Sequence, residues 1–310
     1  AIAEGMENSP YFEIARGIAA VGDGEARLAR GEVAFVVTVP AGFARRLMRG
    51  ERPQILIEAD ATDPASASNA LGAFGDIVSR AVSRELPAAH AGAPALPAVD
   101  LVVHRKYNPE GITRYNIVPG LLGVILTMTC VLSTALSLTR EVERGTMENL
   151  LAMPTRASEI MFGKIAPNIV LGFVQVAIIL IAARYAFGVP MLGSMWVLLA
   201  GLLAFIAANV SLGYLFSTLA RSQMQAMQLT FFFFLPSILL SGFMFPFRGM
   251  PVWAQWIGET LPLTHVLRIV RGVLLKGNDF ANITTELLPI LAFMLAVGAV
   301  TLLRFRRTLD

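Results

Sequence analysis

The chain has 310 residues, of which 55% are hydrophobic and 15% are charged, and its formal net charge is +3. With a mean hydropathy of +0.63, this composition excludes an ordinary soluble domain and predicts a polytopic membrane protein. Nucleic-acid binding is disfavoured, because the sequence has no basic stripe with interleaved aromatic residues. The single cysteine, Cys130, cannot form a disulfide framework, and the three histidines lack the spacing of a metal site.

Residues 1–116 are polar and are expected to form a small α/β domain. Hydrophobic periodicity predicts helices over 9–20, 25–31, 43–48 and 66–86, and strands over 32–39, 54–60 and 99–106. Helices that alternate with strands are typical of an α/β fold. The sequence starts at Ala1, without a methionine or a signal peptide, so we expect its natural N-terminus to lie further upstream.

Residues 117–310 contain five apolar segments, each long enough as a helix to cross about 30 Å of hydrocarbon at about 1.5 Å per residue. We therefore predict an α-helical polytopic membrane protein with a small N-terminal α/β domain. The five segments cover 117–138, 165–187, 194–219, 228–246 and 285–303.

Basic residues beside the last span predict the orientation of the chain. Arg304, Arg306 and Arg307 follow that span directly, and positive charge beside a span marks the cytoplasmic side. An odd number of spans then places residues 1–116 outside the cytoplasm. Aromatic residues near the expected outer interface agree with this topology, whereas basic residues in the outer stretch 247–284 weaken it. The aromatic residues are Tyr115, Tyr185, Trp196, Trp253 and Trp256; the basic ones are Arg248, Arg268, Arg271 and Lys276.

The charged loop 139–164 separates the first two apolar segments and cannot lie in lipid, where each charge costs about 2.5–3.5 kcal/mol. Gly145 permits a sharp chain reversal, Thr146 can cap a helix, and Glu148 suits the positive end of that helix. The apolar stripe of this predicted helix consists of Met147, Leu150 and Leu151. A short amphipathic helix at a membrane surface suits docking into a groove of another protein. A surface loop that only joins two spans explains these local features equally well.

The outer stretch 247–284 is broken by prolines and carries two tryptophans. Such broken helices are tolerated where protein or a water-filled cavity covers their backbone, so the stretch can lie in the interface or enter the membrane. It can close a transport pathway from outside or serve only for packing. The candidate residues for an outer gate are Pro246, Trp253, Trp256 and Glu259.

The sequence contains no motif for nucleotide binding or catalysis. Gly163-Lys164 is followed by Ile165 instead of Ser or Thr, so the phosphate-binding loop pattern fails. No ionisable residue lies in the middle of a predicted span, which argues against a carrier driven by an ion gradient. Polar residues within the spans are candidates for lining a pathway, although such residues more often join helices. They are Asn168, Gln175, Asn209 and Ser211.

Residues 139–277 together resemble the permease subunits of type-2 ATP-binding-cassette exporters, in the subgroup with a large external domain. The resemblance rests on the order and spacing of short motifs in the loop and the outer stretch. These are Glu143-Arg144-Gly145-Thr146-Met147-Glu148, Leu150-Leu151, Pro154, Gly163-Lys164, Pro167, Leu235-Pro236, Ser241-Gly242-Phe243, Phe245-Pro246, Met250-Pro251, Leu261-Pro262 and Arg271-Gly272.

This resemblance implies a half-transporter in a bacterial cytoplasmic membrane, with a further span before the external domain. A second permease, identical or different, and two cytoplasmic ATPase subunits that bind ATP-Mg are the implied partners, together with membrane lipid and a periplasmic adaptor. No cofactor is expected on this chain itself. The loop would supply the coupling helix that enters the ATPase. Its coupling residues would be Glu143, Arg144, Gly145, Thr146, Met147, Glu148, Leu150, Leu151 and Lys164.

Two other functions remain open at this stage. The chain can be a membrane-anchored receptor or assembly protein whose external domain binds a partner, and a neighbouring ATPase gene would distinguish this from an exporter. It can also be a secondary transporter, which would work on an ion gradient without ATP. For the exporter, hydrophobic or amphipathic drug-like compounds are the expected cargo. Spans rich in methionine and phenylalanine suit such compounds, but they suit contact with lipid equally well.

Overall fold

The computed structural model describes residues 2–9, 12–15, 22–85, 99–145 and 157–307. The chain forms two compact units, residues 1–116 and residues 117–310.

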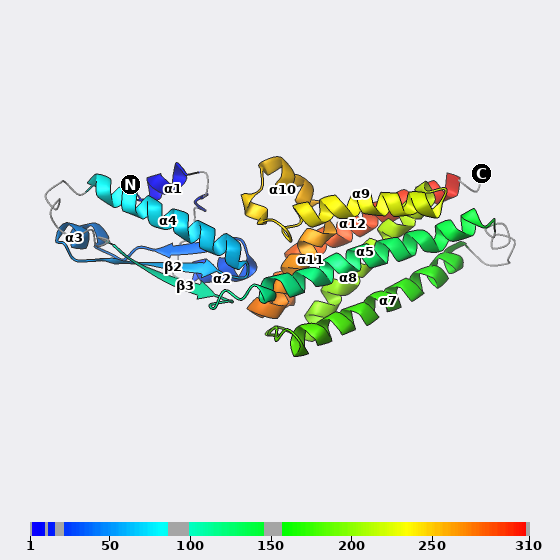
Figure 1. Ribbon diagram of the computed structural model, residues 1–310, viewed down its shortest axis with the longest axis horizontal. Helices are drawn as coiled ribbons and strands as arrows, with labels where there is room; N and C mark the ends of the chain where they lie inside the picture. The colour runs from blue at the N-terminus through cyan, green and yellow to red at the C-terminus, as the bar shows by residue number, and fades with distance from the viewer. Residues whose placement is uncertain (1, 10–11, 16–21, 86–98, 146–156, 308–310) are drawn as a thin grey trace. The chain divides into compact units, whose positions relative to one another are not determined.

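The first unit is built on a three-stranded sheet with the order β1-β2-β3. Strands β1 (Phe35–Thr38) and β2 (Gln54–Asp60) are antiparallel, whereas β2 and β3 (Asp100–Lys106) are parallel. Helix α4 (Pro64–Glu85) comes between β2 and β3 in the chain and lies along the sheet (Figure 1). A parallel pair requires such a crossover connection. The other described helices of this unit are α1 (Ile2–Glu7), α2 (Asp23–Arg30) and α3 (Phe43–Met48).

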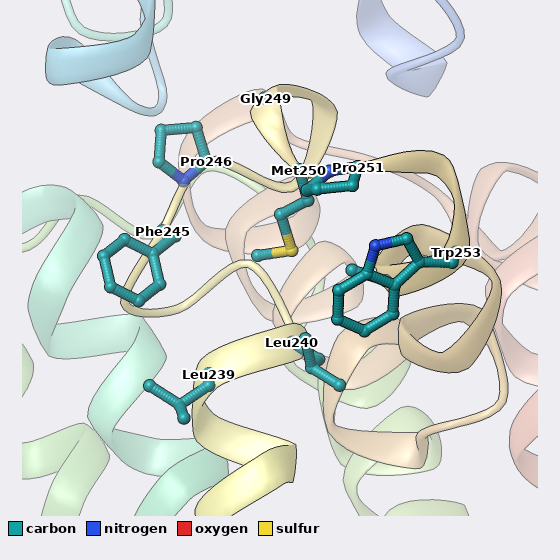
Figure 2. A pocket seen from close by; sticks show the side chains of 9 residues that line it. Leu239, Leu240, Phe245, Pro246, Gly249, Met250, Pro251 and Trp253 are labelled. Atoms are coloured by element: carbon teal, nitrogen blue, oxygen red, sulfur yellow. The ribbon is translucent and has the colours of Figure 1, made fainter.

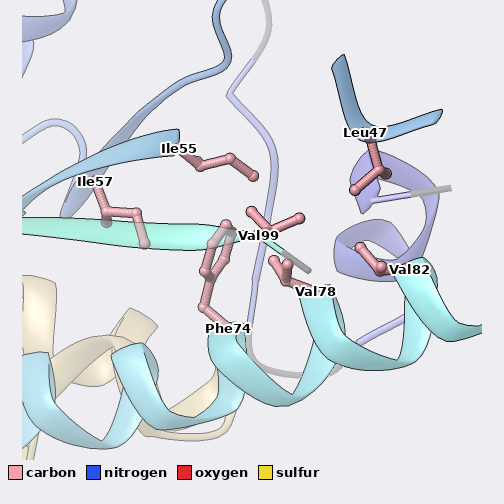
Figure 3. Packing of buried hydrophobic residues seen from close by; sticks show 7 residues of the cluster. All are labelled: Leu47, Ile55, Ile57, Phe74, Val78, Val82 and Val99. Atoms are coloured by element: carbon pink, nitrogen blue, oxygen red, sulfur yellow. The ribbon is translucent and has the colours of Figure 1, made fainter. Parts of the chain in front are cut away.

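The core of the first unit lies between the sheet and α4 (Figure 3). Ile55 and Ile57 are buried on one face of β2, since successive strand residues point to opposite faces. Phe74, Val78 and Val82 recur at the helical spacing on α4 and pack against them. The α/β fold expected for this part of the chain is confirmed, and α3 and β2 have the predicted bounds.

The predicted helix over 9–20 is wrong in its described part. Residues 12–15 are not helical, and the described helix of this region, α1, ends at Glu7. Phe12 instead lies edge-on to Phe35 and Phe74, with ring centroids 6.3 and 6.2 Å away. Burial of this aromatic ring against the sheet and α4 overrides the local preference for helix.

The second unit contains five helices that are long and apolar enough to cross a membrane, among the described residues, as the sequence predicts. They are α5 (Arg114–Glu143), α7 (Ala157–Tyr185), α8 (Met195–Leu219), α9 (Gln223–Leu240) and α12 (Phe280–Arg307). The fourth span was predicted over 228–246, but α9 is shifted towards the N-terminus. The Ser222 side chain accepts a hydrogen bond from the Gln225 amide and caps its start. Beyond its end, Gly242 takes a φ of +82°, which turns the chain away.

Helices α5 and α8 form the centre of the bundle, with 56% and 50% of their most apolar windows buried, against 17% for α7, α9 and α12. Close approach of α5 and α8 depends on Gly213, because a Cβ there would lie 2.7 Å from the Val131 carbonyl oxygen. The outer faces of α7, α9 and α12 expose large apolar side chains such as Ile178, Phe232 and Leu295. Such faces suit contact with lipid or with another membrane-spanning chain.

The two ends of the bundle carry different connections. The stretch after α9 forms a short 3-10 turn η2 (Phe247–Gly249), helices α10 (Val252–Glu259) and α11 (Pro262–Arg271), and the π-helical turn η3 (Gly272–Lys276). Figure 1 shows α10 at the end of the bundle opposite to the C-terminal end of α5. The 188–193 loop joins the α10 end, because Leu192 and Gly193 donate backbone hydrogen bonds to Leu274 and Val273.

Candidate functional site

The C-terminal end of α5, where the charged loop begins, is bonded to the start of α9. Glu143 Oε2 accepts a hydrogen bond from Gln223 Nε2 at 2.6 Å and faces the Gln223 backbone nitrogen at 3.4 Å. Just beyond the helix, Gly145 has a φ of +68°, a conformation that glycine adopts without strain. The chain therefore leaves α5 in a sharp turn, beside a second connection at the same end of the bundle.

Most of the predicted coupling residues lie outside the described residues. Among them, the structure describes Glu143, Arg144 and Gly145, all exposed at the end of α5. Lys164 lies on α7, and only its backbone is described. The residues that lie outside are Thr146, Met147, Glu148, Leu150 and Leu151. Their predicted role in docking stays a prediction.

Two of the candidate pathway residues form side-chain pairs between α5 and α7. Thr129 Oγ1 donates to Gln175 Oε1 at 2.7 Å, and Ser133 Oγ lies 3.0 Å from Asn168 Oδ1. Both pairs lie near the middle of their helices. The Gln175 side chain is only half-buried, and only one of its two amide atoms contacts Thr129, whose hydroxyl also lies 2.7 Å from the Ile125 carbonyl oxygen. A polar seam thus follows the outer edge of the α5–α7 contact.

The other two candidates lie on α8 and bond to their own helix. Asn209 is fully buried, and its Nδ2 donates to the Phe205 carbonyl at 3.0 Å. Ser211 donates in the same way to Ala207 at 2.8 Å. Within the described chain, neither residue bonds to the pairs on α5 and α7, so the structure does not bring the four candidates together.

An apolar pocket of about 480 Å³ lies between the end of α9 and helix α10. Pro246 and Trp253, two of the candidate gate residues, line it together with Phe245 and Met250, as Figure 2 shows. Trp256 is exposed and is not among the residues that line the pocket. An apolar pocket rimmed by aromatic rings and a thioether suits hydrophobic groups rather than ions.

Glu259, the fourth candidate, belongs to a cluster of charged side chains that joins α10, α11 and α12. His265 Nδ1 lies 2.6 Å from Glu286 Oε2, and its Nε2 lies 2.9 Å from the Glu259 carbonyl oxygen. Arg268 pairs with Glu259 at 2.5 Å and with Glu286 at 3.3 Å. Its guanidinium also lies over the Phe247 ring, 4.8 Å from the centroid. We call Glu259, His265, Arg268 and Glu286 the charge cluster.

The sequence does not predict the charge cluster, since its histidines lack the spacing of a metal site and Glu259 stands only as a gate candidate. Glu286 is 21 positions from His265, and only the reversal between α11 and α12 brings them together. One signal was available. Two acidic and two basic side chains in a mostly apolar stretch rarely remain unpaired when helices pack there.

Comparison with known proteins agrees with the motif resemblance. A family model described as "ABC-2 family transporter protein" matches residues 1–303. The chain is 30% identical over 273 residues to the "Probable multidrug ABC transporter permease YbhR" of Escherichia coli K12, covering 88% of this chain and 73% of the relative. It is 28% identical over 311 residues to YbhS of the same organism, covering 98% and 81%. The "Inner membrane transport permease YhhJ" is 30% identical over 292 residues, covering 92% and 76%.

The family match extends over nearly the whole sequence and includes both compact units. The second unit carries five helices suited to a membrane in its described part, and no residue pattern for nucleotide binding occurs in the sequence. The chain is therefore a multi-pass membrane protein that belongs to the ABC-2 family of transporter proteins.

Proposed function

We propose that the chain is the permease subunit of an ATP-driven exporter in a bacterial cytoplasmic membrane. It works as a dimer with a second permease, and separate cytoplasmic ATPase subunits bind and hydrolyse ATP-Mg. Residues 1–116 lie outside the cytoplasm, where they can meet an adaptor. The cargo is a hydrophobic or amphipathic compound. Family membership and the names of relatives as multidrug or transport permeases support this proposal.

The observation that carries the proposal is the family match over residues 1–303, and the bond between Glu143 and Gln223 connects the loop to a second span. The charged loop leaves the bundle at Glu143, and α9 begins at Gln223. A force applied to the loop therefore acts on both α5 and α9. Helix α9 ends at the apolar pocket, and the stretch that contains η2 connects it to α10. Helix α9 thus runs from the end of the bundle where the loop begins to the pocket that holds two of the proposed gate residues.

The polar seam between α5 and α7 supports a pathway or a permease partner at this face. An amide NH2 in hydrocarbon costs several kcal/mol when it lacks a hydrogen-bond partner. The Gln175 amide atom that does not contact Thr129 lacks a partner in the same way if the α5–α7 face meets lipid. Water in a pathway, or the second permease, would supply the missing partner.

Reconstitution tests the proposal. The full-length permease and its ATPase are placed in vesicles, and ATP hydrolysis is measured alongside the movement of a fluorescent hydrophobic dye. The wild type should move dye only with ATP. Replacing Met147, Leu150 and Leu151 by serine, or Glu148 by alanine, should abolish dye movement while the permease still inserts and the ATPase remains active.

A matched control is Glu110→Ala, which removes an exposed acidic residue from the first unit. It should move dye at the wild-type rate. Dye movement driven by an ion gradient without ATP would contradict the proposal, as would normal transport by the loop variants.

A further inference from the structure

His265 lies buried between two hydrogen-bond acceptors. Its side chain is 5% exposed. One ring nitrogen, Nδ1, is 2.6 Å from the Glu286 carboxylate, and the other, Nε2, is 2.9 Å from the Glu259 backbone carbonyl. A carbonyl oxygen can only accept, so Nε2 must carry a hydrogen. A second hydrogen must then lie between Nδ1 and Glu286, because a bare nitrogen and a bare carboxylate repel each other.

This geometry requires two hydrogens on the pair of His265 and Glu286, whichever of the two side chains carries the second hydrogen. Either His265 is a doubly protonated imidazolium beside an ionised Glu286, or a neutral His265 accepts from a protonated Glu286. Both arrangements hold one proton more than a neutral histidine with an ionised glutamate. Arg268 Nη1 lies 3.3 Å from the same Glu286 oxygen and favours the ionised carboxylate. The extra proton therefore belongs on His265.

We propose that His265 and Glu286 form a proton-binding site, and that the bound proton holds helices α10 and α11 against α12. This proposal does not depend on the proposed function, because His265 and Glu286 can bind a proton whether or not the chain works with an ATPase. With the proton bound, the charge cluster has two positive and two negative groups and is neutral. Without it, one negative charge in a mostly buried setting loses its counter-charge, which is costly in a protein interior.

Outside the charge cluster, the described elements η2, α11 and η3 carry the basic residues Arg248, Arg271 and Lys276. Helix α11 carries Arg271, which donates to the Gly242 carbonyl at 3.4 Å, and η3 carries Lys276. Helices α8 and α9 contain no Asp, Glu, Lys, Arg or His. The titratable Tyr214 of α8 lies about 20 Å along that helix from Gly201, where α11 packs, at 1.5 Å per residue.

Loss of the proton breaks one of the two contacts of His265. The ring then either leaves the Glu259 carbonyl, which frees the C-terminal end of α10, or leaves Glu286, which frees α12. Glu286 lies about 9 Å from the start of α12, at 1.5 Å per residue, so the site is near one end of the bundle. A site in this position acts on the α10–α11 segment rather than carrying protons across the membrane at mid-depth.

Hydrogen–deuterium exchange of the full-length protein in lipid nanodiscs tests the proposal. Exchange of the amides of α10 and α11 is followed from about pH 5 to pH 9 and corrected for the pH dependence of the intrinsic exchange rates. The wild type should lose protection as pH rises, with a limiting slope of about tenfold per pH unit, as expected for one proton. The His265→Gln variant should show no such slope.

His104→Gln is the matched control, because His104 is exposed on β3 in the first unit. It should keep the wild-type slope. Glu286→Gln removes the carboxylate but keeps the histidine, and should move the transition to lower pH; this variant decides the matter if His265→Gln does not fold. A flat wild-type profile over the whole range would overturn the proposal. A wild-type slope in His265→Gln, or an unmoved transition in Glu286→Gln, would do the same.

Discussion

At the scale of single residues, Lys106 shows how the sheet of the first unit accommodates charge. Its Nζ lies 2.5 Å from Glu25 Oε1 and 2.9 Å from Glu58 Oε1. The hydrogen bond from Lys106 lowers the pKa of Glu25 below its ordinary value. Hydrogen bonds to Glu25 and then Glu58 raise the pKa of Lys106 above its own. The pairing therefore ties α2 to β2 and β3.

Replacing Lys106 by methionine should speed hydrogen exchange in β2 and β3 by at most about fivefold at neutral pH, as expected for a surface ion pair. Because the pKa of Glu25 is lowered, its ion pair stabilises the fold at pH values above the ordinary pKa of 4.5, and this stability is lost as pH falls. Because the pKa of Lys106 is raised, its ion pairs stabilise the fold at pH values below the ordinary pKa of 10.5, and this stability is lost as pH rises. The difference between wild type and variant should thus shrink at both extremes. A difference that grows in acid would contradict this account.

A variant of Gln175 can distinguish two roles of the polar seam: joining α5 to α7, or lining a pathway. A hydrogen bond between membrane helices is worth about 0.6 kcal/mol on average, so Gln175→Leu should scarcely change thermal stability in detergent. If the seam faces a pathway, dye movement in vesicles should nevertheless fall. Val174→Leu, on the neighbouring exposed position of α7, is the control and should leave both unchanged. Wild-type transport by Gln175→Leu would assign the seam to packing alone.

At the scale of helices, Gly213 limits how closely α5 and α8 can pack. A Cβ there would lie 2.7 Å from both the Val131 carbonyl oxygen and Thr134 Cβ. Since a backbone atom cannot move aside cheaply, Gly213→Ala should cost about 1–3 kcal/mol, the usual range for overpacking. Thermal unfolding in detergent measures this. Gly298→Ala on α12 meets no atom within 4 Å and should leave the midpoint unchanged. Equal midpoints for the two variants would contradict the close contact.

Elements with a clear period were predictable from the sequence. The alternating strand β2 and the long apolar helices α5, α7, α8 and α12 lie where their patterns indicate, because burial on one face or in lipid dictates those patterns. The end of α9 was not predicted, since the apolar sequence continues past Leu240 and only Ser241-Gly242 stops the helix. The region around Phe12 failed because its conformation depends on distant partners, Phe35 and Phe74.

The candidate site was predictable in kind but not in its contacts. The candidates on α7 and α8 indicate polar groups within spans, but not that Thr129 of α5 meets Gln175. The charge cluster depends on a chain reversal between His265 and Glu286, which no local pattern encodes. Residues that act through long-range pairing, such as Gln223 with Glu143, are hidden from sequence reasoning for the same reason.

At the scale of the whole molecule, the account depends on which end of the bundle faces the cytoplasm. The C-terminal end of α5 and the start of α9 share one end through Glu143 and Gln223. The 188–193 loop and η3 share the other. The account requires the first end to meet an ATPase inside the cell, and the first unit to lie outside. Cys130 is the single cysteine and is buried, so Cys130→Ala provides a background for labelling.

The most direct measurement is the labelling of Glu148→Cys and Glu51→Cys, each in that background, with a membrane-impermeant maleimide on intact cells. The account predicts that position 51 reacts in intact cells, whereas position 148 reacts only after the membrane is opened. Labelling of position 148 from outside intact cells would place the loop beyond the reach of a cytoplasmic ATPase and contradict the proposed function.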